Sequence, residues 1–301
     1  MGENMEIKHL IKLYKILKKE NIKIGESLQN YSSFKIGGTC KIMLFPKNIK
    51  QAKKTLKVLT KNKIKFVILG NATNVLISGD IDVVFCTKNL NKIKIKHENV
   101  YAESGVSLFK LNEKLKDNSL GGLERSFGIP GSVGGGIVQN CGAYGFSLSD
   151  NLKKVVVFDG KRVRKIKKEN LFFAYRTSEF KKNKNLVVLA GIFKLFKTPK
   201  IEIETKLNEI ITTRKEKQPY DYPSAGSVFK RVDGVIISKL IDELGFKGFK
   251  VGGAMVSEKH AGFIINYDHA TYDDVIMLIN YIKNKIKLEK NIDLELEIEL
   301  L

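Results

Sequence analysis

The sequence of 301 residues contains no tryptophan, only five prolines, four histidines and three cysteines. The cysteines, Cys40, Cys86 and Cys141, are odd in number and far apart, without a C-x-x-C pair or a histidine cluster, which argues against a disulfide framework and a zinc site. We therefore predict no metal centre. Cys86 ends an apolar run and is expected to be a small buried hydrophobe, and packing is also the default expectation for Cys141.

Long apolar runs are also absent, and none approaches the length of a membrane span. The N-terminal stretch is interrupted by Lys8, Lys12, Lys15 and Lys18, so it lacks the unbroken apolar centre of a signal peptide. The composition is 43% hydrophobic and 28% charged, which is typical of a globular protein long enough for two or three domains. We expect a cytoplasmic location.

Arginine is scarce despite a formal net charge of +21. It occurs at six positions: Arg125, Arg162, Arg164, Arg176, Arg214 and Arg231. Nucleic-acid readers favour arginine for bidentate contacts, whereas the lysines here are scattered among periodic apolar residues. We predict no nucleic-acid partner and interpret the charge as compositional bias that also suits small anionic ligands. A lysine-rich RNA- or envelope-binding protein stays an alternative, without an RNA-binding motif to support it.

Glycine, by contrast, is concentrated in residues 128–136 (GIPGSVGGG) and 140–145 (NCGAYG). So many glycines around one proline are expected to make a poor core element, because glycine admits positive φ and close backbone approach. Successive N–H groups in such turns form concave sites for phosphate. A bound nucleotide is the leading hypothesis for this stretch, and a pair of tight turns is the alternative.

A second small-residue loop, residues 69–76 (LGNATNVL), follows the apolar run 64–69, which predicts a short buried strand. Turns of this kind after a strand often hold phosphate. The chain has no G-x-G-x-x-G opening a helix and no G-x-x-x-x-G-K-[ST], which argues against Rossmann and P-loop domains.

Hydrophobic periodicity predicts an α+β protein. The expected helices cover residues 6–20, 48–62, 108–116, 201–217, 236–244 and 273–287. The expected strands cover residues 41–45, 100–102, 155–158, 163–166 and 186–196, with a turn at Asp159-Gly160. Strict alternation over residues 293–300 (DLELEIEL) predicts a half-buried terminal strand.

In order along the chain, several segments resemble one family, the flavoenzyme UDP-N-acetylenolpyruvoylglucosamine reductase, also called UDP-N-acetylmuramate dehydrogenase. They are residues 33–38 (SFKIGG), the loop at Gly70, residues 121–124 running into 128–145, residues 175–180 (YRTSEF), residues 218–219 with 224–230 (SAGSVFK), and residues 252–254 with 260–263 (HAGF). The segment between Lys230 and Ser257 is too short for a tyrosine-bearing insertion found in one subgroup, so the chain resembles the short form.

The resemblance implies a vanillyl-alcohol-oxidase-like (PCMH-like) fold, in which two α+β subdomains bind FAD non-covalently and a C-terminal α+β domain covers the substrate. The implied boundaries are an N-terminal helical segment at 1–31, FAD-binding subdomains at 32–88 and 89–197, and a substrate domain at 201–301 whose last strand, 292–301, returns toward the FAD site. A monomer is expected.

The resemblance also implies which residues hold the FAD, with its pyrophosphate on backbone amides of the two glycine-rich loops. The expected cofactor contacts are Gly70, Asn71, Ala72, Thr73, Asn74, Leu76, Gly105, Gly131, Ser132, Gly134 and Gly135. Ala72 and Thr73 depart from the family's usual Gly-x-Gly-Ser-Asn, and alanine has less φ freedom than glycine.

The implied reaction reduces UDP-N-acetylglucosamine enolpyruvate to UDP-N-acetylmuramate in cytoplasmic peptidoglycan precursor synthesis. NADPH would reduce FAD, and flavin N5 would pass hydride to the substrate. Arg176 resembles the arginine that stabilises the substrate carboxylate, Ser227 the proton donor, and Glu297 the acid that stabilises the enol. Without the resemblance, these three would be read as a strand-end arginine, a turn serine and part of a solvated face.

Six further residues match positions that could contact the nucleotide-sugar phosphates or NADPH: Tyr175, Arg214, Gln218, Lys230, His260 and Asn266. Lys230 is also close enough in sequence to support Ser227 as a proton donor, since a serine needs a neighbouring cation or relay. Arg231 and Val232 stand where the family usually has asparagine and proline. A flavin oxidase of the same superfamily is the main alternative enzyme. Such enzymes often tether FAD through histidine or cysteine, and neither glycine-rich loop contains histidine.

Overall fold

The computed structural model describes residues 6–232 and 234–301. The chain divides into two compact units, each built from three separate segments. Unit 1 comprises Met1–Glu26, Cys40–Asn71 and Ile81–Thr212, and unit 2 comprises Ser27–Thr39, Ala72–Asp80 and Thr213–Leu301. The domain boundaries expected at residues 31/32, 88/89 and 197/201 stay predictions.

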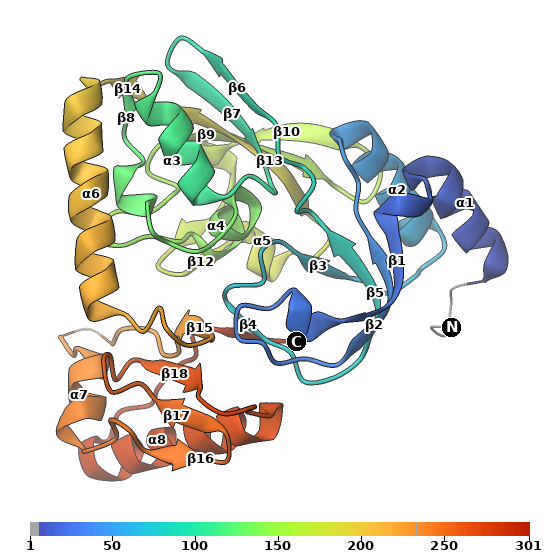
Figure 1. Cartoon of the computed structure of the whole chain (residues 1–301). Helices are drawn as coiled ribbons and strands as arrows, with labels where there is room; N and C mark the ends of the chain where they lie inside the picture. Colours follow the sequence, from blue (N-terminus) through green and yellow to red (C-terminus); the bar gives the residue numbers. More distant parts are fainter. Residues whose placement is uncertain (1–5, 233) are drawn as a thin grey trace. The chain divides into compact units, whose positions relative to one another are not determined.

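The first sheet of unit 1 has the strand order β1–β2–β5–β3 (Figure 1). Its strands are β1 (Ile22–Ser27), β2 (Thr39–Leu44), β5 (Ile81–Cys86) and β3 (Val67–Leu69), and β5 pairs in parallel with both β2 and β3. The prediction of a buried strand over 64–69 was wrong for its first half. β3 begins at Val67 and Ile68 is 40% exposed, because β3 is an edge strand.

Helices α1 (Ile7–Leu17) and α2 (Ile49–Lys61) pack on this sheet through a shared hydrophobic core. Leu13 and Leu17 of α1 meet Leu56 and Leu59 of α2 in that core, and all four are fully buried. The predicted helices at 6–20 and 48–62 are therefore confirmed. The α2 helix begins where the sequence supplies a cap, since the Asn48 side chain accepts the Gln51 N–H.

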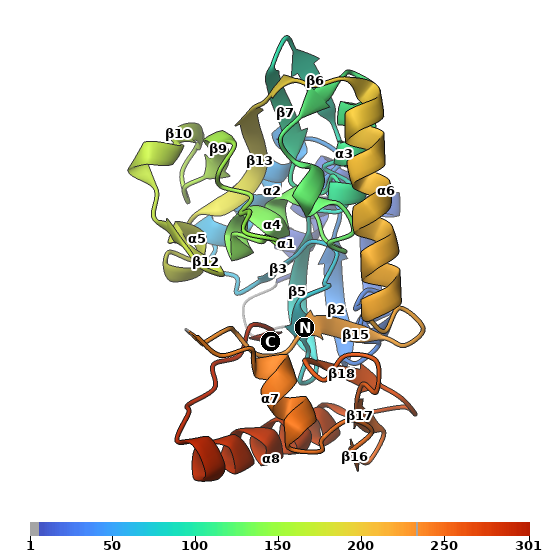
Figure 2. The same ribbon diagram turned by 90° about the vertical axis from the view of Figure 1, so that its left-hand side faces the viewer.

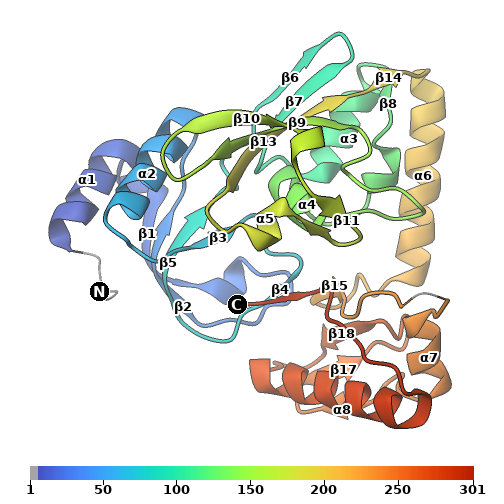
Figure 3. The ribbon, with the colours of Figure 1, turned by 180° about the vertical axis from the view of Figure 1, so that it is seen from behind.

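The second sheet of unit 1 is antiparallel, with the order β10–β9–β13–β7–β6 (Figure 3). Its strands are β6 (Ile93–Lys96), β7 (Asn99–Glu103), β9 (Leu152–Phe158), β10 (Val163–Lys167) and β13 (Val187–Lys194). Alternate residues of β9 pack into two cores. Val155 and Val157 pack with helices α3 (Leu108–Lys116) and α4 (Val133–Gln139), whereas Val156 and Phe158 join the core shared with α1 and α2. This two-sided burial fixes the strand register.

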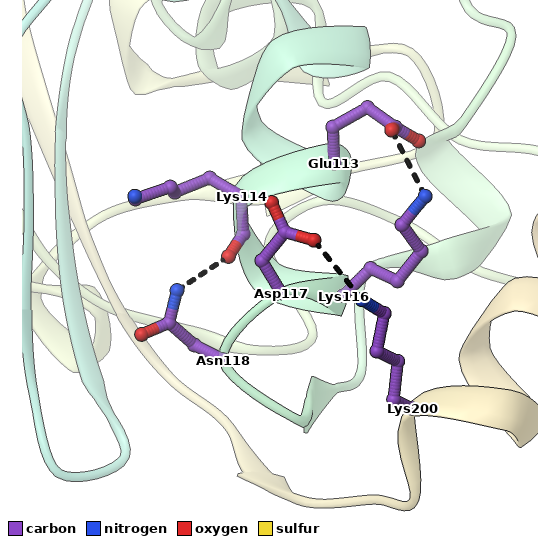
Figure 4. A network of polar contacts seen from close by, with 6 residues as sticks. All are labelled: Glu113, Lys114, Lys116, Asp117, Asn118 and Lys200. Carbon is purple, nitrogen blue, oxygen red and sulfur yellow. Dashed lines mark hydrogen bonds and ion pairs between the residues drawn. The ribbon is translucent and has the colours of Figure 1, made fainter.

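Helix α3 has the predicted bounds, Leu108–Lys116, and α4 covers Val133–Gln139. Polar contacts surround the end of α3 (Figure 4). Lys116 pairs with Glu113 at 3.0 Å, and Asp117 pairs with Lys200 at 3.6 Å. The latter pair joins α3 to the first residue of α6, but both side chains are exposed, so it contributes little to stability.

Helix α6 (Lys200–Lys217) buries Ile203, Leu207 and Ile210 against Phe127. This spacing of four and three residues is one face of a helix, and Arg214 continues the same face. The remaining short elements of unit 1 are β8 (Leu120–Gly121) paired with β14 (Phe196–Lys197), the hairpin of β11 (Phe173–Ala174) and β12 (Thr177–Ser178), and α5 (Glu179–Lys182).

Unit 2 contains an antiparallel sheet of order β15–β18–β17–β16 and two helices that pack on it (Figure 2). The elements are β15 (Ser224–Ser227), α7 (Ile237–Glu243), β16 (Lys250–Val251), β17 (Ala254–Val256), β18 (Phe263–Asn266) and α8 (Tyr272–Lys290). A capping box starts α8, because Thr271 and Asp274 each accept the other's backbone N–H. The expected α+β class is confirmed.

The C-terminal residues correct one prediction. Alternation predicts a strand over 293–300, whereas only β19 (Glu299–Leu300) is a strand, parallel to β4 (Val75–Leu76). Leu294 and Ile298 are buried, but Leu300 is 43% exposed. The segment changes partner along its length, from residues 228–230 to residues 74–76, so no single ladder forms.

Candidate functional site

The glycine-rich stretch of unit 1 forms a helix as well as turns, which corrects the expectation of a poor core element. The Ser132 side chain caps α4 by accepting the Gly135 N–H at 3.4 Å. Gly136 lies inside that helix, where a Cβ would stand 2.9 Å from Leu148 Cδ2 and 3.0 Å from Cys141 Sγ. The glycines therefore permit close packing of a short helix, at a propensity cost that the packing offsets.

Three other glycines hold backbone segments of unit 1 close together. A Cβ on Gly70 would meet Ser132 Oγ at 2.6 Å, one on Gly134 would meet Ser104 Cβ at 2.6 Å, and one on Gly105 would clash with backbone carbonyls of residues 87 and 88. Gly135, by contrast, is exposed. The loop after β3, the end of β7 and the start of α4 thus pack closely, with the Ser132 and Ser104 side chains and two backbone carbonyls beside the glycines. These close approaches explain why the chain has glycine at positions 70, 105 and 134.

Ser104 is a residue that the sequence reasoning missed. It is fully buried, and its Oγ has no hydrogen-bond partner among the described residues. Its carbonyl accepts the Gly134 N–H at 2.8 Å. Ser104 therefore lies at the closely packed segments around Gly70, Gly105 and Gly134, which we call the glycine cradle. A buried hydroxyl without a partner costs about 1–3 kcal/mol, so a ligand that supplies the partner would be bound more tightly. The only signal in the sequence is its position directly before Gly105.

Arg176 lies in the two-residue loop of the β11–β12 hairpin with a positive φ of 51°. This conformation is usually left to glycine or asparagine in such loops. The guanidinium donates from Nη2 to the Gly142 carbonyl at 2.6 Å and lies 5.0 Å from the centre of the Tyr175 ring. Asn140 anchors the hairpin through its side-chain amide, which donates to the Ala174 carbonyl at 2.9 Å. A strained arginine held by its neighbours is typical of a functional position.

The loop over residues 69–76 is divided between the units: Gly70 and Asn71 belong to unit 1, and Ala72 to Asn74 belong to unit 2. Ala72 has a φ of 48°, so alanine adopts the left-handed conformation that glycine would take more easily. Ser33 holds this residue, since its N–H and its Oγ donate to the Ala72 carbonyl at 3.1 and 3.4 Å. The single proton of this hydroxyl is shared with the Ser224 carbonyl, which is the closer acceptor at 2.7 Å.

Ser227 and Glu297 lie close together within unit 2. The Glu297 N–H donates to the Val228 carbonyl at 2.8 Å, and the Glu297 carbonyl accepts from the Asn74 side-chain amide at 3.0 Å. Ser227 follows a β-bulge in β15 at which Gly226 has a φ of 81°. Bulges re-aim the next side chain and are frequent beside active sites.

The other candidates of unit 2 have identified partners. Lys230 pairs with Glu295, Asn266 donates to the Phe34 carbonyl at 3.1 Å, and the Arg214 Nη1 donates to Gln218 at 3.3 Å. Arg214 is 8% exposed, and its Nε has no partner among the described residues. Arg214 is thus a buried cation that has no carboxylate partner within residues 6–232 and 234–301.

His260 and Leu76 are both held within unit 2, His260 by a hydrogen bond to the backbone and Leu76 by burial in the core. The His260 Nδ1 accepts the Gly262 N–H at 3.1 Å, so the neutral ring carries its proton on Nε2. Burial lowers the pKa of this imidazole, and Lys247 adds to the effect. The Leu76 side chain is fully buried in the core of unit 2.

The candidates therefore fall into two groups. Unit 1 carries the glycine cradle, Tyr175 and Arg176, whereas unit 2 carries Ser227, Glu297, Lys230 and the remaining polar candidates. In the described part of the chain, no group of three or more histidine, cysteine or acidic residues is arranged to hold a metal ion. No helix of residues 6–232 and 234–301 is both long and apolar enough to cross a membrane.

Comparison with known proteins identifies the family. Residues 40–163 match the FAD binding domain, and residues 218–301 match the UDP-N-acetylenolpyruvoylglucosamine reductase C-terminal domain. The reductase of Fervidobacterium nodosum is 41% identical over 283 residues, which cover 92% of this chain and 91% of the relative. The chain belongs to the UDP-N-acetylenolpyruvoylglucosamine reductase family. The reductase of Syntrophomonas wolfei subsp. wolfei is 40% identical and covers 96% of this chain and 97% of its own.

Solved structures agree with this family. The crystal structure of UDP-N-acetylenolpyruvylglucosamine reductase (MurB) from Thermus caldophilus has a TM-score of 0.78 and 29% identity, and covers 93% of this chain and 97% of its own. Phl p 4.0202, a glucose dehydrogenase, shares the fold alone, with a TM-score of 0.53 and 14% identity over 74% of this chain and 52% of its own. The predicted vanillyl-alcohol-oxidase-like FAD-binding fold is confirmed, and the chain is an FAD-containing oxidoreductase.

The residues of unit 1 fit FAD. The cofactor's pyrophosphate needs N–H donors at a place where no side chain intrudes. The exposed Gly135 in the first turn of α4 leaves room, because an added Cβ there would lie 3.6 Å from its nearest neighbour, Ser132 Oγ. The Ser104 hydroxyl, which has no hydrogen-bond partner among the described residues, adds a polar group that a ligand could satisfy.

Proposed function

We propose that this chain reduces UDP-N-acetylglucosamine enolpyruvate to UDP-N-acetylmuramate with NADPH as the electron source, in peptidoglycan precursor synthesis. The observation that carries the proposal is the backbone hydrogen bond from Glu297 to Val228, the residue after Ser227, in a chain of the reductase family. Bound FAD would supply the hydride.

Arg176 would bind the carboxylate of the enolpyruvyl group. Addition of hydride to the terminal methylene pushes electrons toward that carboxylate, so the negative charge there grows in the transition state. A planar, permanently charged guanidinium matches a carboxylate bidentately, and a fixed charge aimed at a developing one lowers the barrier. The hairpin that holds Arg176 in a strained conformation supports this role.

Ser227 would donate its hydroxyl proton to the carbon next to the ether oxygen, and Glu297 would stabilise the enol form of the carboxylate. The proton must come from a group held at one face of the substrate. The β-bulge beside Ser227 and the two backbone contacts of Glu297 support such fixed positions.

Arg214 would serve the phosphates of a substrate or of NADPH. A buried guanidinium without a carboxylate is an expensive arrangement, and an anionic ligand would relieve it. Lys230, Tyr175, Gln218, His260 and Asn266 would contribute further contacts. The cytoplasmic location and the monomeric state stay predictions.

Two measurements test the proposal. The purified protein should show a flavin absorption spectrum and release intact FAD on heat denaturation. NADPH oxidation should then depend on the enolpyruvyl substrate and yield the lactyl ether, as followed by absorbance and mass spectrometry. A protein that stays colourless after reconstitution with FAD contradicts the proposal. Equal NADPH consumption with oxygen alone would favour the flavin oxidase.

A further inference from the structure

Asn74 belongs to a loop expected to contact FAD, yet its side-chain amide nitrogen and its backbone carbonyl bind the C-terminal segment. Its side-chain amide donates to the Glu297 carbonyl at 3.0 Å, and its own carbonyl accepts the Glu299 N–H at 2.9 Å. Two groups of one residue therefore hold two alternate residues of the C-terminal segment. Both partners lie in unit 2 with Asn74.

The backbone of Glu297 is thereby fixed from both sides. Its N–H is bound to the Val228 carbonyl, next to Ser227, and its C=O is bound to Asn74. Beyond this point the segment continues as β19, in register with β4 at Glu299–Val75 and Leu300–Leu76. The Asn74 amide supplies a side-chain contact at the point where the segment leaves residue 228 and joins β4.

We propose that Asn74 is a positioning residue for Glu297, and that its amide group serves this acid rather than the cofactor. The inference rests on the proposed function, in which Glu297 stabilises the enol of the substrate. A catalytic group must be held within a fraction of an ångström of its productive place. Without the amide, the carbonyl of Glu297 loses this hydrogen bond and the segment between residues 294 and 299 gains freedom.

The test uses the FAD-loaded enzyme and the variants Asn74→Ala and Asn74→Asp. Alanine removes the amide, and aspartate keeps its size but replaces the donor with an acceptor that repels the carbonyl. Stopped-flow absorbance measures flavin reduction by NADPH and flavin reoxidation by the substrate as separate steps. We expect reoxidation to slow by about 10- to 100-fold in both variants, as for a catalytic group displaced by about 1 Å, with reduction nearly unchanged.

A matched control loosens the same segment elsewhere. Ser78 donates from its Oγ to the Leu301 backbone oxygen at 2.8 Å, so Ser78→Ala removes one side-chain contact four residues beyond Glu297. We expect this variant to reoxidise at close to the wild-type rate. A loss as large as that of Asn74→Ala would show that general loosening is the cause and would overturn the proposal.

A double-mutant cycle with Glu297→Gln distinguishes positioning from a purely structural role. If Asn74 acts through Glu297, Asn74→Ala should have no further effect on reoxidation in the Glu297→Gln background. A full additional loss in that background would overturn the proposal. Thermal unfolding and circular dichroism of each variant show whether it is folded, and Asn74→Asp serves if the alanine variant is not.

Titration with FAD, followed by flavin fluorescence, provides a readout that does not depend on turnover. We expect the affinity of the Asn74 variants for FAD to stay within about threefold of the wild type. A large loss of FAD affinity with normal reoxidation would show that the Asn74 amide binds the cofactor and would overturn the proposal. If the wild-type enzyme itself is not reoxidised by the enolpyruvyl substrate, the proposed function has failed instead, and the two failures are thus distinct.

Discussion

The Lys230 ammonium lies 2.8 Å from the carboxylate of Glu295, and the Lys230 N–H donates to the Glu295 carbonyl at 2.9 Å. The lysine expected to support Ser227 therefore already has an anionic partner. That partner is 74% exposed, whereas the lysine side chain is 27% exposed. Water and salt weaken such a pair, so the ammonium can exchange Glu295 for a buried anion of a ligand.

This pair leads to a prediction about substrate affinity. Lys230→Met keeps much of the side-chain volume and removes the charge, so we expect the KM for the UDP-sugar to rise about tenfold with a smaller change in kcat, as for one lost charge-assisted hydrogen bond. Steady-state kinetics measure both constants. Glu295→Gln is the control, and it should leave kcat and KM near the wild-type values. Equal effects of the two variants would show that only the ion pair matters.

Ser227→Ala should separate the two half-reactions. Because we assign proton donation to this hydroxyl, FAD binding and reduction by NADPH should be nearly intact, while reoxidation by the substrate slows by roughly 10²–10⁴-fold, as for a lost general acid. Stopped-flow absorbance measures both rates. Reoxidation at the wild-type rate would leave Ser227 as a structural residue at the end of β15.

Arg176→Gly should leave the stability of the fold nearly unchanged while it lowers the rate of substrate reduction. Glycine adopts the φ of 51° without penalty, so the variant should be about as stable as the wild type despite the lost bond to Gly142. Substrate reduction should nevertheless fall by about 10²–10³-fold, because the carboxylate loses its fixed charge. Thermal unfolding and turnover assays test the two halves. A large loss of stability with normal turnover would make Arg176 a structural residue.

Gly105→Ala tests the glycine cradle without any ligand. The new Cβ would stand 2.7 Å from the Lys88 carbonyl oxygen and closer still to that of Thr87. Since backbone cannot yield easily, we expect a loss of about 1–3 kcal/mol in the free energy of unfolding. Gly79→Ala is the matched control, because nothing lies within 4 Å of its added Cβ. It should be neutral or slightly stabilising when both are measured by urea denaturation of the apoprotein.

The raised pKa of Glu103 should make the stability of the protein depend on pH. This side chain is 5% exposed, and burial raises its pKa above the ordinary 4.5 despite hydrogen bonds from the Lys92 N–H and the Tyr101 hydroxyl. The folded state thus holds this proton more tightly than the unfolded chain does. Stability contributed by the group is present below pH 4.5 and falls as the pH rises through the raised folded value.

Glu103→Gln should therefore stabilise the protein relative to the wild type at pH 7, with a smaller difference at pH 4. Melting temperatures across that range measure the change. Glu98→Gln is an opposite control, because the hydrogen bond from Lys194 lowers the pKa of that exposed carboxyl. A Glu103→Gln difference that does not vary with pH would contradict the prediction.

Helices were predictable where the apolar spacing reports one buried face. Residues 108–116 form a helix with the expected bounds, because Leu108, Leu111 and Leu115 all face one core. The helix at 133–139 was not predictable, because glycine disfavours helices. Glycine is needed there because residues outside the helix pack closely against it. Cys141 and Leu148 occupy the space beside Gly136, and no local pattern encodes that contact.

The site was predictable from motifs only in part. Alternation over residues 293–300 correctly indicates burial of Leu294 and Ile298, but it does not say which strand is the partner. Partner choice depends on Asn74 and Val228, which are far away in the chain. Ser104 also escaped sequence reasoning, because an unpartnered hydroxyl is a property of packing.

The pairing of β4 with β19 also constrains the order in which the two units can fold during synthesis. Residues 75–76 leave the ribosome long before residues 299–300, yet each strand is the other's partner. Contacts of such sequence separation form slowly. Until residues 299–300 have been synthesised, β4 presents an unpaired edge, so unit 2 should be the later unit to mature and the more dependent on chaperones during synthesis.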